Sequence, residues 1–158
     1  MSKLTVLYYS KTGNTEKMAE AVEKGARNSD YEVETKLASV ENFDPKNLSD
    51  YEGIIIGSPT YYGIMANPVK DFFDESIKIH GDLSGKVGAA FASCGTPGGG
   101  SESTCMSIIK AMLVHGMTVR GFYDFAHYGP VSTGDPNERV LSECKQMGKI
   151  IAEMVSDR

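Results

Sequence analysis

Residues 10–15 bring together the chemical groups that bind an anion. The segment reads S-K-T-G-N-T, with three hydroxyl side chains, one amide and one glycine. An apolar stretch precedes it and a helical pattern follows, so it lies where the free amides and positive dipole end of a helix favour an anion. The glycine lets the backbone close around a ligand, and the polar side chains add donors. The sequence therefore predicts an anion site formed by Ser10, Lys11, Thr12, Gly13, Asn14 and Thr15.

The spacing of this loop indicates which anion it binds. A Walker loop needs G-x-x-x-x-G-K-[ST], and a dinucleotide loop needs G-x-G-x-x-G. Residues 8–20 contain neither pattern. A single terminal phosphate monoester remains as the predicted ligand. The alternative is that the segment forms only a turn and a helix cap, which the same residue types often do.

Two further loops carry groups that suit a flat ligand. Residues 59–63, P-T-Y-Y-G, offer two aromatic faces, although tyrosines in loops are often only partly buried packing. Residues 94–101, C-G-T-P-G-G-G-S, match neither nucleotide pattern. Three consecutive glycines nevertheless allow a backbone to approach a flat ligand and to offer it amides and carbonyls. The alternative for this loop is a flexible lid that contacts no ligand.

Apolar patterns predict the elements that position these loops. Buried or half-buried strands are predicted over residues 5–9, 31–37, 53–57, 87–93 and 118–125. Helical spacing predicts helices over residues 15–26, 67–77, 103–115 and 136–155, with at most a short helix within 39–50.

Helix boundaries can also be predicted. Asn67 is expected to cap a helix that has Pro68 in its first turn. Gly116 is expected to end the helix over residues 103–115 in a left-handed conformation. Residues 135–138, D-P-N-E, read as a capping box with proline at the first helical position.

Strands that alternate with helices predict an α/β fold, a five-stranded, doubly wound parallel sheet covered on both faces, in a single domain over residues 1–158. Ligands of such folds bind beyond the carboxyl ends of the strands, at the switch point of strand order. The loops after the first, third and fourth strands should therefore meet there, with the loop after the fifth strand as a rim.

Composition narrows the function further. A net charge of −5 disfavours nucleic acid, whose phosphates need a basic face, and no apolar run is long enough to span a membrane. Three widely spaced cysteines fit neither a disulfide framework nor a C-x-x-C site, and three histidines lack metal-ligand spacing, so no metal is expected. We expect each cysteine to be a small buried apolar residue. Because residues 1–3 lead directly into a strand pattern, without a signal peptide, we expect a cytoplasmic protein.

Taken together, the three loops resemble those of the flavodoxin superfamily, over nearly the whole chain. S-K-T-G-N-T is similar to the flavodoxin phosphate loop, while S-P-T-Y-Y-G, C-G-T-P-G-G-G-S-E and H-G-M resemble the NAD(P)H:quinone oxidoreductase branch typified by tryptophan-repressor-binding-protein-like enzymes. The resemblance implies strand order 2-1-3-4-5 and FMN as cofactor, with its phosphate in the 10–15 loop.

The resemblance also implies roles for single residues. The isoalloxazine ring would be lined by Pro59, Thr60, Tyr61, Tyr62 and Gly63. Its other side and the ribityl chain would face Ser93, Cys94, Gly95, Gly98 and Gly99. His127 would close the rim, and His127 or Tyr128 would be a polar contact for a substrate. No side chain is assigned a catalytic role of its own, because the flavin is the redox centre.

Two functions follow from this resemblance, and a third is independent of it. The first is a flavodoxin-type electron carrier between redox partner proteins, ferredoxin-like or flavoenzyme donors and acceptors, favoured by the T-G-N-T loop and the short run from Phe125 to Asp135. The second is an NAD(P)H:quinone oxidoreductase, favoured by S-P-T-Y-Y-G and G-G-G-S-E. The third is a non-redox phosphate-binding or scaffold domain. A homodimer is compatible with each function.

Overall fold

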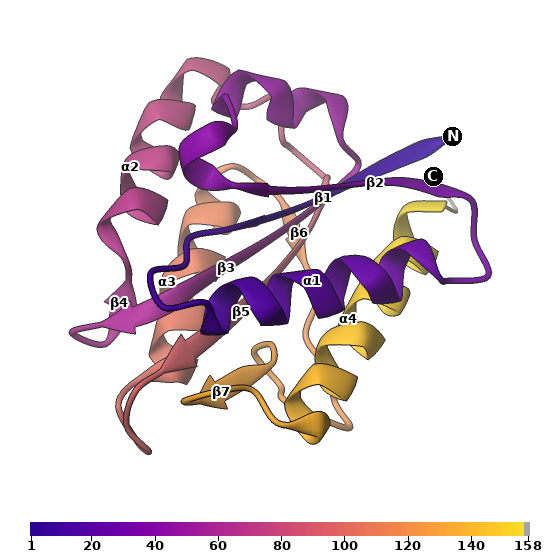
Figure 1. The fold of residues 1–158 in the computed structure, drawn as a ribbon. Coiled ribbons are helices and arrows are strands. Elements are labelled where there is room, and N and C mark those ends of the chain that lie inside the picture. The colour runs from indigo at the N-terminus through magenta and orange to yellow at the C-terminus, as the bar shows by residue number, and fades with distance from the viewer. Residues whose placement is uncertain (157–158) are drawn as a thin grey trace.

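The sheet at the centre of the molecule has the predicted strand order. The computed structural model describes residues 1–156, and its main strands are β1 (Ser2–Tyr8), β2 (Val33–Ser39), β3 (Gly53–Tyr61), β5 (Val87–Cys94) and β6 (Thr118–Val119). They pair in parallel in the order β2-β1-β3-β5-β6, which confirms the order 2-1-3-4-5 (Figure 1). Two short strands add to the predicted five, namely β4 (Ile64–Met65) and β7 (Val131–Thr133).

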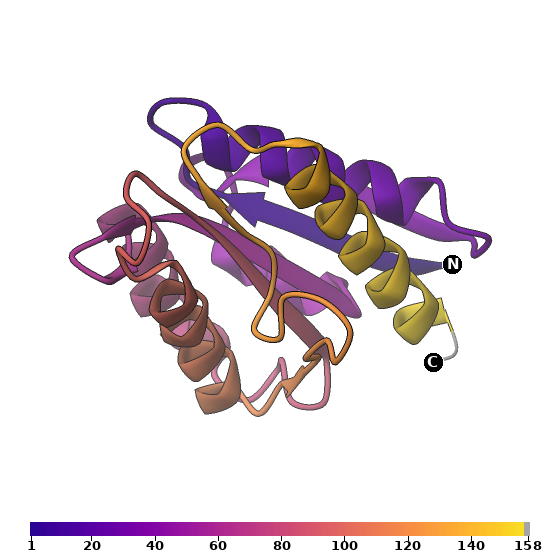
Figure 2. The same cartoon turned by 90° about the horizontal axis from the view of Figure 1, so that it is seen from below.

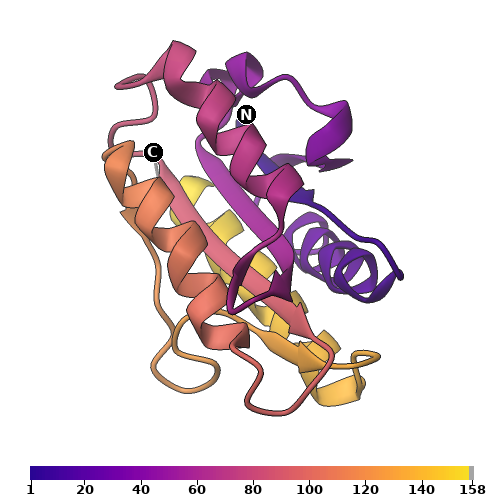
Figure 3. The same cartoon turned by 90° about the vertical axis from the view of Figure 1, so that its left-hand side faces the viewer.

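Helices cover both faces of this sheet. The α-helices are α1 (Asn14–Arg27), α2 (Asn67–Glu75), α3 (Ser101–Val114) and α4 (Glu138–Ser156). Figures 2 and 3 show α1 and α4 on one face and α2 and α3 on the other. Three short 3-10 helices complete the α2 side, η1 (Val40–Asn42), η2 (Pro45–Asp50) and η3 (Ser76–Ile79).

Each face has its own apolar core. The core beneath α1 and α4 contains Met18, Val22 and Met147 together with residues of β1, β3 and β5. Phe72 and Ile108 belong to the core beneath α2 and α3. The central strands are apolar on both sides because both sides are covered. This two-sided burial fixes the register of the sheet and so the positions of the loops at its carboxyl edge.

The segment predicted as a loop after residue 57 is partly strand. β3 continues to Tyr61 and turns back into β4, with which it pairs in antiparallel fashion. Tyr62 and Gly63 form the turn with φ values of 53° and 79°. Two residues of positive φ define the type I′ turn whose twist matches a hairpin. The loop prediction for residues 58–66 was therefore wrong at residues 58–61 and 64–65.

The predicted fifth strand, residues 118–125, was wrong beyond residue 119. Arg120 N still donates to Gly88 O, but Phe122 then turns inward and stacks on Phe125 at a ring-centroid distance of 4.7 Å. Both rings belong to the core beneath α1 and α4, so the backbone leaves the sheet to bury them. The chain returns as β7, which pairs with the end of β5.

Two predicted caps were also misplaced. Ala66, not Asn67, is the cap of α2, and the Asn67 side chain donates to Asp71 instead. At α4 the Asn137 side chain accepts from Val140 N, so the helix begins at Glu138 rather than at residue 136. The predicted left-handed Gly116 is confirmed, with φ of 76°. The first strand begins three residues earlier than predicted, and shifts of one to two residues occur at other ends, as is usual for element boundaries.

No helix within residues 1–156 is both long enough and apolar enough to cross a membrane.

Candidate cofactor site

The loop after β1 and the carboxyl ends of β3 and β5 meet in one pocket at the carboxyl edge of the sheet. Its volume is about 180 Å³. Its lining residues are Lys11, Thr12, Asn14, Thr15, Pro59, Thr60, Tyr61, Ser93, Cys94 and Gly95. All ten were predicted as site residues; nine come from the three predicted loops, and Ser93 comes from the end of the strand predicted over residues 87–93. The parallel pairing β1–β3–β5 brings the loops together, since it aligns the carboxyl ends of the strands.

The loop of residues 10–15 presents the amino end of α1 to this pocket. Gly13 caps the helix in a left-handed conformation, with φ of 100°, and its amide donates to Ser10 Oγ over 3.1 Å. No described side chain caps the first helical amides, and the first backbone bond of the helix runs from Lys17 N to Gly13 O. The amides of Asn14, Thr15 and Glu16 precede that bond, so they are available to an anion.

A buried hydroxyl pair joins this loop to the end of β5. Thr15 Oγ1 and Ser93 Oγ lie 2.8 Å apart, and the two residues are 1% and 5% exposed. Burial strengthens such a hydrogen bond and makes an unpaired hydroxyl costly. The pair therefore holds the phosphate loop and the third loop at a fixed separation.

The β3–β4 hairpin forms a second wall. Tyr61 is 42% exposed, and Tyr62 at the turn is fully exposed. α3 anchors the hairpin, because Thr104 Oγ1 donates to Thr60 Oγ1 over 3.0 Å and Ser103 Oγ donates to Gly63 O over 2.8 Å. Partial burial, followed by the nearby Tyr9, raises the pKa of Tyr61. Tyr61 is therefore a neutral ring at neutral pH.

The glycine-rich loop, residues 95–100, folds over Cys94. Cys94 Sγ donates to Thr96 O, and a Cβ on Gly99 would lie 2.4 Å from that sulfur. Gly98 and Gly100 have φ values of 69° and 103°, which favour glycine. The loop thus needs glycine for its shape at residues 98, 99 and 100. Gly98 and Gly99, which were predicted as site residues, do not line the pocket itself.

Cys94 differs from the expectation of burial. It is partly exposed beside the pocket, whereas the other two cysteines are buried in the cores. Burial raises the pKa of the Cys105 thiol to about 12, and burial also raises that of Cys144. These two behave as the predicted apolar residues.

His127 and Tyr128 lie in a neighbouring pocket. This pocket has a volume of about 220 Å³ and also includes Glu102 at the start of α3. His127 Nδ1 donates to Phe122 O over 2.7 Å, which leaves Nε2 without a proton in the neutral ring. The prediction that His127 closes the rim of the phosphate pocket remains a prediction, because the two pockets share no lining residue.

Some residues that shape the site were missed by sequence reasoning. Ser103 and Thr104 on α3 donate hydrogen bonds to the hairpin. The only signal in the sequence was the S-E-S-T run at the start of a helix, whose hydroxyl side chains can donate to a preceding segment.

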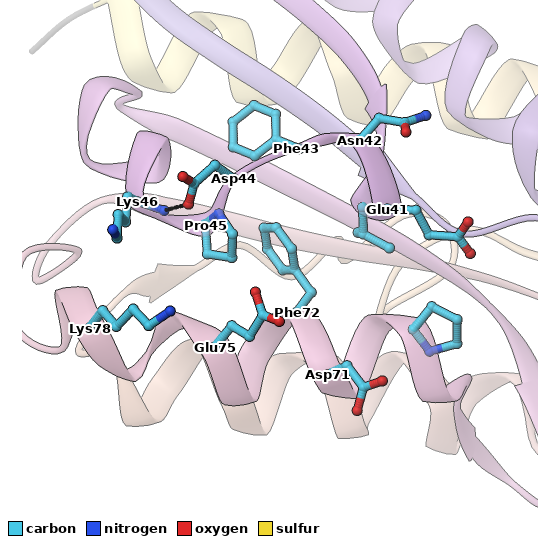
Figure 4. Close-up of a pocket in the computed structure, with 12 residues that line it drawn as sticks. Glu41, Asn42, Phe43, Asp44, Pro45, Lys46, Asp71, Phe72, Glu75 and Lys78 are labelled. Atoms are coloured by element: carbon cyan, nitrogen blue, oxygen red, sulfur yellow. Dashed lines mark hydrogen bonds between the residues drawn. The ribbon is translucent and has the colours of Figure 1, made fainter.

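A larger groove, about 750 Å³, was also missed (Figure 4). It lies between residues 40–46 and α2, with Phe43 and Phe72 in its floor and Glu41, Asp71 and Glu75 among its charged residues. It is lined by a mixture of acidic and basic side chains and shares no residue with the cofactor pocket.

Comparison with known proteins defines the class of this chain. The Flavodoxin family model matches residues 6–111. A flavodoxin of Aquifex aeolicus is 37% identical over 99% of this chain and 88% of its own length. An NAD(P)H dehydrogenase (quinone) of Archaeoglobus fulgidus is 36% identical, covering 98% of this chain and 97% of its own length. The chain belongs to the flavodoxin family.

Solved structures agree. A flavodoxin from the domain Archaea superposes with a TM-score of 0.79 at 34% identity, covering 97% of this chain and 98% of that one. A flavodoxin, WrbA-like protein from Agrobacterium tumefaciens gives a TM-score of 0.83 at 23% identity, over 99% of both chains, which supports the fold. This chain is accordingly a flavodoxin-type flavoprotein, and its cofactor is FMN.

The donor set of the pocket fits FMN. An uncapped helix end with hydroxyl and amide side chains suits a phosphate monoester, and Tyr61 beside a glycine-rich loop suits a planar ring. Within residues 1–156 no group of three His, Cys, Asp or Glu residues is placed to hold a metal ion.

Proposed function

We propose that this protein is an electron carrier that shuttles electrons between redox partner proteins, with FMN held by the three loops at the carboxyl edge of the sheet. The phosphate would lie on the amides of residues 14–16 and the hydroxyl of Thr12, and the ring would lie between Tyr61 and residues 94–99. When bound, FMN supplies the redox chemistry by accepting and releasing one or two electrons. The observation that carries the proposal is the uncapped amino end of α1 within a pocket built from three loops.

The chain itself would bind, orient and cover the cofactor. The Thr15–Ser93 pair fixes the phosphate loop against the third loop, so the ribityl chain would span a constant gap. The exposed Tyr62 and the half-exposed Tyr61 would leave one edge of the ring open to a docking protein. A carrier needs no more than such an exposed edge and a surface on which a partner can dock.

The segment after β6 supports a carrier rather than an enzyme. Residues 120–130 bury Phe122 and Phe125 and return at once to β7. The resemblance to the quinone oxidoreductase branch implies a longer segment between the fifth strand and the last helix in that branch. We therefore propose ferredoxin-like proteins or flavoenzymes as donors and acceptors, and a monomer or homodimer as the working form. A cytoplasmic location fits the free cysteines within residues 1–156.

NAD(P)H:quinone oxidoreductase activity is the second candidate. It is favoured by the relative in Archaeoglobus fulgidus, named NAD(P)H dehydrogenase (quinone), and by the pocket that contains His127 and Tyr128. In that case the free Nε2 of His127 and the hydroxyl of Tyr128 would contact a substrate.

One pair of measurements separates the two functions. The FMN-loaded protein is mixed with NADH or NADPH and benzoquinone, and in parallel it is titrated with dithionite. A carrier gives no sustained turnover and is reduced in two resolved one-electron steps. Fast turnover, together with reduction in a single two-electron step, would establish the oxidoreductase instead. Failure to take up FMN at all would support the non-redox reading.

A further inference from the structure

A second pocket lies on the α2–α3 side of the molecule. Two helical stripes with the same spacing face each other across it: Lys70, Phe73, Asp74 and Ile77 from α2 and η3, and Ser107, Lys110, Ala111 and Val114 from α3. Met65, His80 and His115 complete its lining, and its volume is about 510 Å³. We call it the α2–α3 pocket. It shares no lining residue with the cofactor pocket.

The walls of the α2–α3 pocket are mainly apolar. Ile77 and Val114 are 69% and 72% exposed at its mouth. Covering such apolar side chains with a ligand is favourable, because it removes apolar surface from water. Lys70 forms an ion pair with Asp74 over 2.7 Å, so the α2 wall of the pocket carries no net charge, while the α3 wall carries the single cation Lys110. The volume lies in the range of roughly 300–1,000 Å³ that is typical of sites for small organic molecules.

One buried polar atom at this pocket has no partner. His115 is 7% exposed, and its Nδ1 is buried without a hydrogen-bond partner among the described residues. The partner of Nε2 determines the tautomer. The single hydroxyl proton of Ser76 is donated to Phe73 O over 2.6 Å, so Ser76 Oγ must accept from Nε2–H of His115, 2.7 Å away.

This tautomer leaves Nδ1 as a bare acceptor. Burial, followed by the nearby His80, lowers the pKa of His115, so the ring is neutral at neutral pH. A buried acceptor that is left unsatisfied destabilises the folded protein. A donor that entered from the pocket would remove this cost. Because Nδ1 is sealed from solvent, a side chain of the wall must move to admit one, and the exposed His80 ring, 5.7 Å from His115 between centroids, is best placed to do so.

We propose that the α2–α3 pocket binds a small, neutral, largely apolar molecule that carries one hydrogen-bond donor, of the phenol class, with its donor on Nδ1 of His115. The ring of such a molecule would pack against Phe73, Ala111 and Val114, and its hydroxyl would lie at the His80–His115 end. Only binding is involved, and no covalent bond is made or broken. The site is separate from the redox site, because the two pockets share no lining residue.

Three matched probes test the proposal on the FMN-loaded protein. Binding of p-cresol, p-fluorotoluene and p-toluate is measured by calorimetry, and the ¹⁵N shift of His115 Nδ1 is followed by NMR. We expect p-cresol to bind at least roughly tenfold more tightly than p-fluorotoluene, since one hydrogen bond to a buried acceptor separates them. We also expect only p-cresol to shift the Nδ1 signal.

Two variants locate the binding. Ala111→Trp fills the pocket and should abolish p-cresol binding, whereas Leu113→Trp, on the same helix but outside the pocket lining, should retain it. Circular dichroism checks folding, and Val114→Trp replaces Ala111→Trp if that variant unfolds. Equal binding of p-cresol and p-fluorotoluene, tighter binding of p-toluate, binding that survives in the filled variants, or no binding of p-cresol would each overturn the proposal.

Discussion

Thr12 is the residue that tests the phosphate loop most directly. It is exposed, lines the cofactor pocket, and has a hydroxyl that the fold does not use elsewhere among the described hydrogen bonds. Thr12→Val should therefore leave stability unchanged but lower the affinity for FMN by about 10- to 100-fold, because a hydrogen bond to a charged group is worth roughly 1.5–3 kcal/mol.

The measurement is quenching of flavin fluorescence on binding, with riboflavin beside FMN. Riboflavin lacks the phosphate, so its affinity should be the same for Thr12→Val and for the unchanged protein. Thr118→Val, an exposed threonine on β6, is the matched control and should change neither affinity. An equal loss for both flavins would place the phosphate elsewhere.

Single residues also show what the sequence could predict of the site. The 10–15 loop was predictable because its residue types act locally, through a helix end that begins beside them. The Thr15–Ser93 pair joins residues 78 positions apart, and nothing in either local pattern signals it. His127 was placed at the rim from a resemblance, yet its ring is held by Phe122 O, a contact that depends on the inward turn of residues 120–125.

At the scale of elements, the α1–α4 contact depends on two glycines. A Cβ on Gly25 would lie 2.0 Å from Lys145 O, and a Cβ on Gly148 would lie 2.0 Å from Val22 O. Glycine to alanine in a helix normally stabilises it by roughly 0.8–1 kcal/mol. Here the sign reverses, since the other helix must move away. Gly148→Ala should destabilise the protein by about 1–3 kcal/mol, the usual cost of overpacking.

Urea unfolding of the apoprotein measures this cost. Gln146→Ala, an exposed position in the same helix, is the control and should have little effect. A Gly148→Ala protein as stable as the control would show that the two helices can separate without cost.

The amino ends of the two central strands were predicted to the residue, because burial on both faces marks them. The isoleucine run of β3 and the small-residue run of β5 have no polar alternation, and both lie at the sheet centre as expected. The 118–125 segment was wrong because its aromatic and β-branched residues suit a strand, while Phe122 and Phe125 are instead needed to fill the core beneath α1 and α4. Local propensity could not show which of these demands prevails.

At the scale of the whole molecule, charge and its position can be separated. The net charge of −5 should speed encounters with a basic partner at low salt. The encounter rate should fall as added salt screens this charge. We expect the rate constant for electron transfer to a basic cytochrome to fall several-fold as ionic strength rises from about 0.01 M to about 0.15 M, over which the Debye length shortens from roughly 30 Å to 8 Å.

Two variants with equal net charge decide where the partner docks. Glu41→Gln and Glu32→Gln each remove one negative charge from an exposed glutamate. Glu41 follows β2 at the carboxyl edge of the sheet, on the groove of Figure 4, whereas Glu32 precedes β2 at the opposite edge. If the partner docks over the cofactor edge, Glu41→Gln slows stopped-flow electron transfer more than Glu32→Gln at low salt, and the difference vanishes at high salt. Equal rates for the two variants would mean that only total charge matters and that this edge is not the docking surface.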